Sequence, residues 1–157
     1  MTYVGIDPGV GGGLAALSER GRVLMATSMP RSPRELVALL IQLPCNSSVV
    51  LEAVHAMPRH LTGGVGNFKL GHNHGMLEGA LAAFNLEVLA VAPVKWQNAL
   101  GCRTKGDKRI TRQRAADMFP QIRVTHATAD ALLLAEYCRR LDAGDRTTRV
   151  VLEQRRR

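Results

Sequence analysis

Residues 2–13, TYVGIDPGVGGG, place a carboxylate, Asp7, at the end of an apolar run and follow it with a glycine-rich turn. The run contains Tyr3, Val4 and Ile6, which is typical of a central strand covered on both faces. Open α/β sheets bind their ligands at the carboxyl ends of strands. Because Asp is rarely buried unless it is paired or bound to a metal ion, Asp7 indicates a functional site.

Two further acids have comparable positions. Glu52 follows the apolar residues 49–51 in SVVLEAVHAMP, and Asp130 opens an apolar helix in THATADALLLAEYC. Three separate elements would therefore deliver three carboxylates to one place. Ligand sets made of oxygen atoms favour Mg²⁺ or Mn²⁺ over zinc, so the sequence predicts a site for one of these ions.

Composition and length are typical of one soluble domain. The chain has 157 residues, 46% of them hydrophobic and 22% charged. No apolar run is long enough for a membrane span and no signal peptide is apparent, so we expect a protein of the cytoplasm with no membrane partner. The three cysteines are widely spaced, which favours neither a disulfide framework nor a zinc knuckle. We expect a folded domain over residues 1–142 and a basic tail over residues 143–157.

Positive charge is concentrated in one segment. The formal net charge is +8, and residues 103–114 contain one acid, Asp107, and six basic residues: Arg103, Lys105, Lys108, Arg109, Arg112 and Arg114. A solvated helix face is the ordinary explanation of such a run. Together with a carboxylate cluster that needs cations, it indicates binding to nucleic acid. Aromatic residues make up only 4% of the chain, so backbone electrostatics rather than base stacking should dominate binding.

The periodicity and turn residues predict an α/β fold with a mixed sheet covered by helices. The expected strands are residues 2–7, 14–18, 22–28, a run ending at 52, and 86–91. The expected helices begin at Pro33, after a glycine-rich loop at 57–66, and after Pro93, and cover about 108–118 and 128–141. The glycines after Asp7 fit a tight turn and a close approach of a nucleic-acid backbone better than the phosphate cradle of actin-like ATPases, because that fold needs a far longer chain.

Five strings in order make nearly the whole chain resemble the RuvC-type Holliday junction resolvases, and most closely their compact phage-type or chloroplast-type branch. The strings are GIDPG (5–9), LEAVHAMP (51–58), FKLGHNHGMLEGALAAFNLEVLAVAPVKW (68–96), KGDKRITRQRAADMFP (105–120) and ADALLLAEY (129–137). The resemblance implies a ribonuclease H-like fold. Its mixed five-stranded sheet has the order 3-2-1-4-5 and helices on both faces.

The resemblance also implies an activity: a nuclease domain that resolves four-way DNA junctions in recombination and repair. It would act as a homodimer, by symmetric hydrolysis with two Mg²⁺ ions, for which Mn²⁺ would substitute, leaving 5′ phosphate and 3′ hydroxyl ends. Asp7 would bind both ions, Glu52 one and Asp130 the other. The enzyme would be found in the cytoplasm, with the nucleoid or in a phage host.

One position departs from the resolvase pattern. Many such resolvases have a second acid three residues before the position of Asp130, where this chain has Ala127. His126 is the expected substitute as a fourth metal ligand, with a hydrogen-bonded structural role as the alternative. If residues 126–130 are all helical, His126 and Asp130 share a face; if Thr128 caps the helix, His126 comes from the preceding loop.

Other residues are assigned to DNA by the resemblance. It places Lys108 near the scissile phosphate, where it would assist catalysis, and it brings His60 and Phe68 toward the junction centre. Phe68 in the core is the alternative. We expect Lys105, Arg109 and Arg112 to contact the DNA backbone. Three glycines four residues apart, at 71, 75 and 79, indicate either packing of a helix on the sheet or a helix contact across a dimer axis.

Two other functions stay open from the sequence. A nuclease of the same fold acting on forks, other branched DNA or RNA/DNA hybrids needs the same carboxylates. A module that binds junctions without cutting them would need none of them, so the presence of all three acids argues against it.

Overall fold

The computed structural model describes residues 1–54, 59–104 and 106–144, with no side-chain description for 59–63. Lys105, the side chain of His60 and all but the first two residues of the expected basic tail therefore lie outside the described residues. The strands are β1 (Thr2–Asp7), β2 (Gly13–Ser18), β3 (Val23–Ser28), β4 (Ser47–Glu52) and β5 (Val88–Val91). The helices are α1 (Pro33–Leu40), α2 (Arg59–Ala83), α3 (Pro93–Ala99), α4 (Lys108–Met118) and α5 (His126–Asp142).

The five strands form one mixed sheet in the order β3-β2-β1-β4-β5, which confirms the predicted order. β1 pairs antiparallel with β2 and parallel with β4, and β4 pairs parallel with β5. In the β1–β4 ladder Ile6 lies opposite Leu51. Asp7 and Glu52, the next residue of each strand, therefore reach the same edge of the sheet on neighbouring strands.

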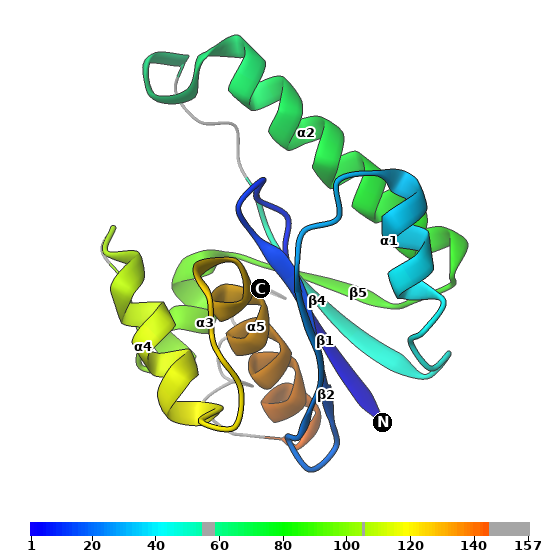
Figure 1. Cartoon of the computed structure of the whole chain (residues 1–157), viewed down its shortest axis with the longest axis vertical. Coiled ribbons are helices and arrows are strands. Elements are labelled where there is room, and N and C mark those ends of the chain that lie inside the picture. The colour runs from blue at the N-terminus through cyan, green and yellow to red at the C-terminus, as the bar shows by residue number, and fades with distance from the viewer. Residues whose placement is uncertain (55–58, 105, 145–157) are drawn as a thin grey trace, which may run out of the picture.

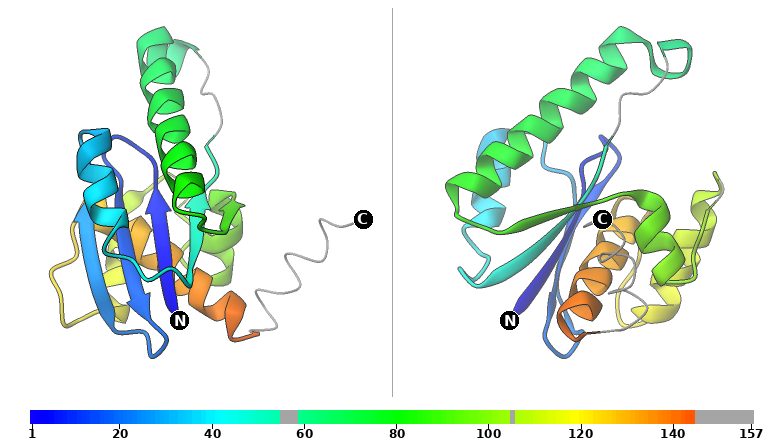
Figure 2. Two further views of the ribbon diagram at one scale, coloured as in Figure 1. Left: turned by 90° about the vertical axis from the view of Figure 1, so that its right-hand side faces the viewer. Right: turned by 180° about the vertical axis from the view of Figure 1, so that it is seen from behind.

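Helices cover both faces of the sheet (Figures 1 and 2). On one face Val4 and Ile6 of β1 join a core with residues of α1 and α2. On the other face Tyr3 joins a core dominated by α5, with contributions from α3 and α4. Successive side chains of a strand point to opposite faces. Asp7 and Glu52 therefore belong to the α5 face, which is the face that also carries Asp130.

Gly5 lets α5 lie directly against the backbone of β1. A Cβ built on Gly5 would meet the carbonyl oxygen of Ala131 and the backbone nitrogen of Ala135 more closely than real Cβ atoms approach. The absence of a side chain in the middle of β1 therefore sets the distance between the central strand and the helix that carries Asp130.

α2 differs from the predicted glycine-rich loop at 57–66, because residues 59–66 are helical. Once a helix has formed, each further residue adds a hydrogen bond at little cost, so it extends through glycines that alone would favour a turn. Leu77 and Leu81 anchor the second half of α2 in the core. The first half projects beyond the sheet in all three views (Figures 1 and 2).

The glycine stripe of α2 does not pack on the sheet. A Cβ built on Gly71, Gly75 or Gly79 would meet no atom within 4 Å, and all three residues are exposed. Packing on the sheet, one of the two explanations offered for this spacing, is therefore wrong. In residues 1–54, 59–104 and 106–144 no helix is both long and apolar enough to cross a membrane.

α5 begins at His126, before the predicted start at residue 128. Thr125, rather than Thr128, is the N-cap, because its hydroxyl accepts a hydrogen bond from the Thr128 backbone N–H while the Thr128 hydroxyl accepts one from the Thr125 N–H. Both threonines suit a helix start, and only their reciprocal bonding selects the first. His126 and Asp130 are consequently one helical turn apart.

The packing across Gly5 predicts that Gly5→Ala destabilises the protein by about 3 kcal/mol or prevents folding, because α5 must move away from β1. Gly11→Ala is the matched control, since a Cβ at Gly11 meets no atom within 4 Å; we expect a change within about 0.5 kcal/mol. Urea unfolding followed by circular dichroism measures both. Equal stability of the two variants would contradict this account of the β1–α5 packing.

Candidate active site

Three carboxylates from three elements converge at the sheet edge. Asp7 ends β1 and is 8% exposed, Glu52 ends β4, and Asp130 lies in the second turn of α5. The negative charge of Asp7 acts to raise the pKa of Glu52 and the pKa of Asp130. Asp7 is therefore close enough to interact with both other acids; that it binds both metal ions, as the resemblance implies, stays a prediction.

The glycine-rich turn after β1 holds the Asp7 carboxylate. Its Oδ1 accepts the backbone N–H of Gly9 at 3.0 Å. Gly12 packs so closely that a Cβ there would lie 2.5 Å from Asp7 Cγ. The turn thus packs against Asp7 itself, and the predicted approach of the turn to the DNA backbone stays a prediction.

Trp96, in α3, orients Glu52. Its indole Nε1–H donates to Glu52 Oε1 at 2.9 Å, and the ring is fully buried. Burial and then the charge of Asp7 raise the pKa of Glu52 to about 7, whereas the hydrogen bond from Trp96 opposes the rise. The sequence analysis missed Trp96. The signal was present, since the one tryptophan follows a strand beside that of Glu52 and a buried indole needs an acceptor.

Asp130 lies near Thr111 of α4, whose hydroxyl donates to the carbonyl of Lys108 at 3.2 Å. Burial raises the pKa of Asp130 and the charge of Asp7 adds to the rise, whereas the nearby Thr111 hydroxyl acts to lower it. One oxygen, Oδ1, is buried without a hydrogen-bond partner. Thr111, itself 1% exposed, was also missed by the sequence analysis, because nothing in the sequence shows which side of α4 faces α5.

This donor set fits a divalent cation. Burial and the charge of Asp7 raise the pKa of Glu52 and of Asp130, and one oxygen of Asp130 has no hydrogen-bond partner; both features call for positive charge. Oxygen ligands match Mg²⁺ or Mn²⁺. Among the described residues no three His, Cys, Asp or Glu side chains lie close enough to hold one ion together. The arrangement therefore brings acids together in interacting pairs rather than as a closed three-ligand cage.

Lys108 is the basic residue whose charge acts on both Glu52 and Asp130. It is the first residue of α4, and its positive charge acts to lower the pKa of both Glu52 and Asp130. Arg109, next to it, is instead paired with Asp107: its Nε and Nη2 donate to the carboxylate at 3.0 and 2.9 Å. The charge of Lys108 thus acts on the carboxylates, whereas the charge of Arg109 is compensated by Asp107.

His126 lies beside Asp130 but already has a partner. Its Nε2 is 3.4 Å from Nη1 of Arg112, and both side chains are exposed. Its charge, when protonated, acts to lower the pKa of Asp130. Ligation of a metal through Nε2 would require Arg112 to move, so the fourth-ligand role of His126 stays a prediction.

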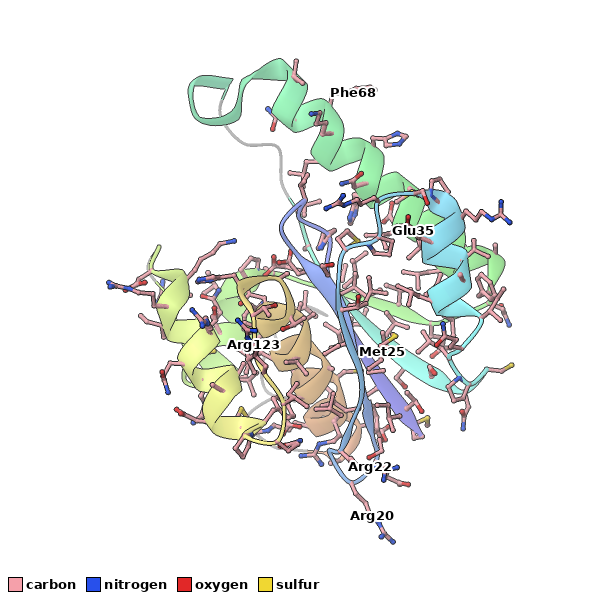
Figure 3. The ribbon with its side chains drawn as sticks, in the orientation of Figure 1. Arg20, Arg22, Met25, Glu35, Phe68 and Arg123 are labelled. Carbon is pink, nitrogen blue, oxygen red and sulfur yellow. The ribbon has the colours of Figure 1, made fainter. Side chains whose placement is uncertain are left out.

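Phe68 is not a core residue. Its side chain is 74% exposed on the projecting half of α2 (Figure 3), and its ring stacks on that of His72 with centroids 6.2 Å apart. The alternative that placed Phe68 in the core is therefore wrong, because this part of α2 has no sheet beneath it. A role at the junction centre stays a prediction.

Comparison with solved structures identifies the fold. The chain is similar to T. thermophilus RuvC in complex with a Holliday junction substrate, with a TM-score of 0.67 and 19% identity over 92% of this chain and 97% of that one. It is similar to a second Thermus thermophilus RuvC structure with a TM-score of 0.65 and 20% identity, at the same coverage. Fowlpox virus resolvase in complex with Holliday junction DNA gives a TM-score of 0.46 and 14% identity over 86% of this chain and 97% of that one. No protein-family model and no curated protein matches the sequence.

The electrostatics predict that Glu52→Gln stabilises the metal-free protein above neutral pH. The folded-state pKa of Glu52 is raised from 4.5 to about 7, so the native state binds the proton more tightly and stability falls as pH rises between these values. We expect the variant to exceed the unaltered protein by on the order of 2 kcal/mol at pH 8, with the gap closing near pH 5. Urea unfolding in EDTA measures this; a gap independent of pH would contradict it.

Proposed function

We propose, from the RuvC-like resolvase fold and the acids at its sheet edge, that the protein is a metal-dependent endonuclease that resolves four-way DNA junctions. The observation that carries the proposal is the convergence of Asp7, Glu52 and Asp130 from three elements, with Asp7 acting on both other acids. The junction substrate is supported by the solved structure of the similar T. thermophilus RuvC, which contains one.

The residues at the sheet edge would have different roles in phosphodiester hydrolysis. Asp7, Glu52 and Asp130 would hold two Mg²⁺ ions, or Mn²⁺ in their place, with Asp7 shared. Bound there, the ions would supply Lewis acidity and an activated water for phosphodiester hydrolysis. Trp96 holds Glu52 Oε1, which leaves Oε2 for a cation. Products with a 5′ phosphate and a 3′ hydroxyl are the expected outcome.

Lys108 would stabilise negative charge at the scissile phosphate. This role is supported by the effect of its charge, which acts to lower the pKa of both Glu52 and Asp130. A preorganised cation directed at developing charge lowers the barrier more than an equivalent charge in water. Arg112 and the exposed remainder of α4 would contact the DNA backbone.

We further infer a homodimer. A four-way junction is approximately two-fold symmetric, and paired nicks need two active sites. The exposed glycine stripe of α2 supports such an assembly, because a Cβ at Gly71, Gly75 or Gly79 would meet no atom of the described residues within 4 Å, which leaves room for a second helix to approach closely. This is the remaining explanation for their spacing.

The first test compares substrates. Purified protein in Mg²⁺ should cut a four-way junction faster than a fork or an RNA/DNA hybrid of the same length, and should linearise a plasmid bearing an extruded cruciform through paired nicks. Preference for forks or hybrids would favour the broader nuclease. Junction binding without cutting in Mg²⁺ or Mn²⁺ would favour the binding module.

The second test removes one acid. Asp7→Asn should lower the junction cleavage rate at least about 1000-fold, as expected for a residue acting at the reacting atoms, while junction affinity stays nearly unchanged. Asp117→Asn is the matched control, because Asp117 is an exposed acid of α4 that accepts a hydrogen bond from Gln113 at 2.8 Å. It should cleave normally. Cleavage by Asp7→Asn at the control's rate would refute the assigned centre.

The third test compares neighbouring cations. Lys108→Gln should slow single-turnover cleavage roughly 10- to 100-fold because it removes the charge at the acids. Arg109→Gln should have a small effect, since Asp107 compensates that charge. Each variant should lower the slope of log affinity against log salt by at most about 0.9. Equal cleavage rates for both variants would contradict the role of Lys108 at the scissile phosphate.

A further inference from the structure

A hollow on the α1 and α2 side of the sheet edge has no place in the reaction described above. Its volume is about 460 Å³. It lies where the β1–β2 turn, the end of β3 and the middle of α2 meet, and Figure 1 shows that turn beneath α2. The residues that line it and enter the argument are Val10, Met29, Arg31, Lys69 and Asn73.

The hollow is cationic. Arg31 and Lys69 are exposed, and in the described part of the chain neither side chain is in an ion pair. No acid is among the residues lining it. Glu35 lines an adjoining hollow, and its carboxylate accepts the backbone N–H of Arg31 at 2.9 Å. Two cationic side chains and the Asn73 amide therefore face a space open to an anion.

The position of the hollow is fixed relative to Asp7. The backbone N–H of Met29 donates to the carbonyl of Gly12 at 2.9 Å, which fastens the end of β3 to the turn after β1. The same turn bonds Asp7 through Gly9 at 3.0 Å. Lys108 approaches the acids from α4, which packs with α5 on the opposite face of the sheet. Positive charge thus flanks the carboxylates from both faces.

We propose that this hollow binds a DNA backbone phosphate other than the scissile one, through Arg31 and Lys69. The proposal rests on the proposed nuclease function. DNA would cross the carboxylate edge of the sheet, with one segment against α4 and a phosphate further along its path in the hollow. The site recognises the phosphate charge and not the base, because every lining group that the argument uses is a cation, an amide or an apolar side chain.

The test is a charge-matched pair of double variants. Arg31→Gln/Lys69→Gln removes two charges from the hollow, and Arg20→Gln/Arg22→Gln removes two from the β2–β3 turn at the far end of the molecule (Figure 3). All four side chains are exposed, so both variants should fold, and circular dichroism verifies this. Junction affinity is measured without Mg²⁺ across a KCl series.

The hollow variant should lose at least about 10-fold in affinity at moderate salt, and its slope against log salt should fall by about 0.9, the value for one phosphate contact. The control should change far less. Equal losses in the two variants, or no loss in the hollow variant, would overturn the proposal.

A second measurement identifies the contact itself. Junctions carrying one neutral methylphosphonate at successive positions should include a position, away from the cut, that weakens binding of the unaltered protein but not of Arg31→Gln/Lys69→Gln. If no such position exists, the hollow does not bind a phosphate. Failure of the nuclease function gives a different result, namely an unaltered protein that binds junctions but leaves them uncut in Mg²⁺.

Discussion

The close packing of α5 against the backbone of β1 is the constraint on which the rest of the structure depends. Gly5 has no side chain to hold the helix away, and Gly13 lies so close to α5 that a Cβ would be 2.5 Å from the carbonyl oxygen of Ala127. These two contacts fix the start of α5 against the first two strands. Asp130, in the second turn of α5, is thereby brought to the strand end that carries Asp7.

The same packing makes the carboxylates costly to the free protein. Burial and mutual repulsion raise the pKa of Glu52 and of Asp130, and the groups that oppose this, Trp96, Thr111 and Lys108, do so only in part. An oxygen of Asp130 is left without a partner. Such a site is stable enough to persist because a large core surrounds it, and a bound cation would relieve both the repulsion and the missing contact. The buried carboxylates therefore lower the stability of the metal-free protein, and a bound cation would raise it again.

The sequence was sufficient for features set by local pattern. The apolar runs that end in acids predicted the strands and the sheet edge that carries the carboxylates, because a buried strand has a strong apolar pattern that stops where the strand ends. The sequence was insufficient where two neighbouring residues suit the same structural role equally well, and where interacting residues are far apart in the sequence. Thr125 and Thr128 both suit a cap, and residues 59–66 look like a turn until the rest of α2 extends through them. Trp96 and Thr111 meet the acids only through tertiary packing.

The central claim is that the three carboxylates form a divalent-metal site, and the most direct measurement is Mn²⁺ binding to the purified protein by calorimetry and electron paramagnetic resonance. The account predicts that the unaltered protein and Asp117→Asn bind Mn²⁺ alike, and that Asp7→Asn binds it at least about 10-fold more weakly. Equal Mn²⁺ affinity in Asp7→Asn and the unaltered protein would contradict the account.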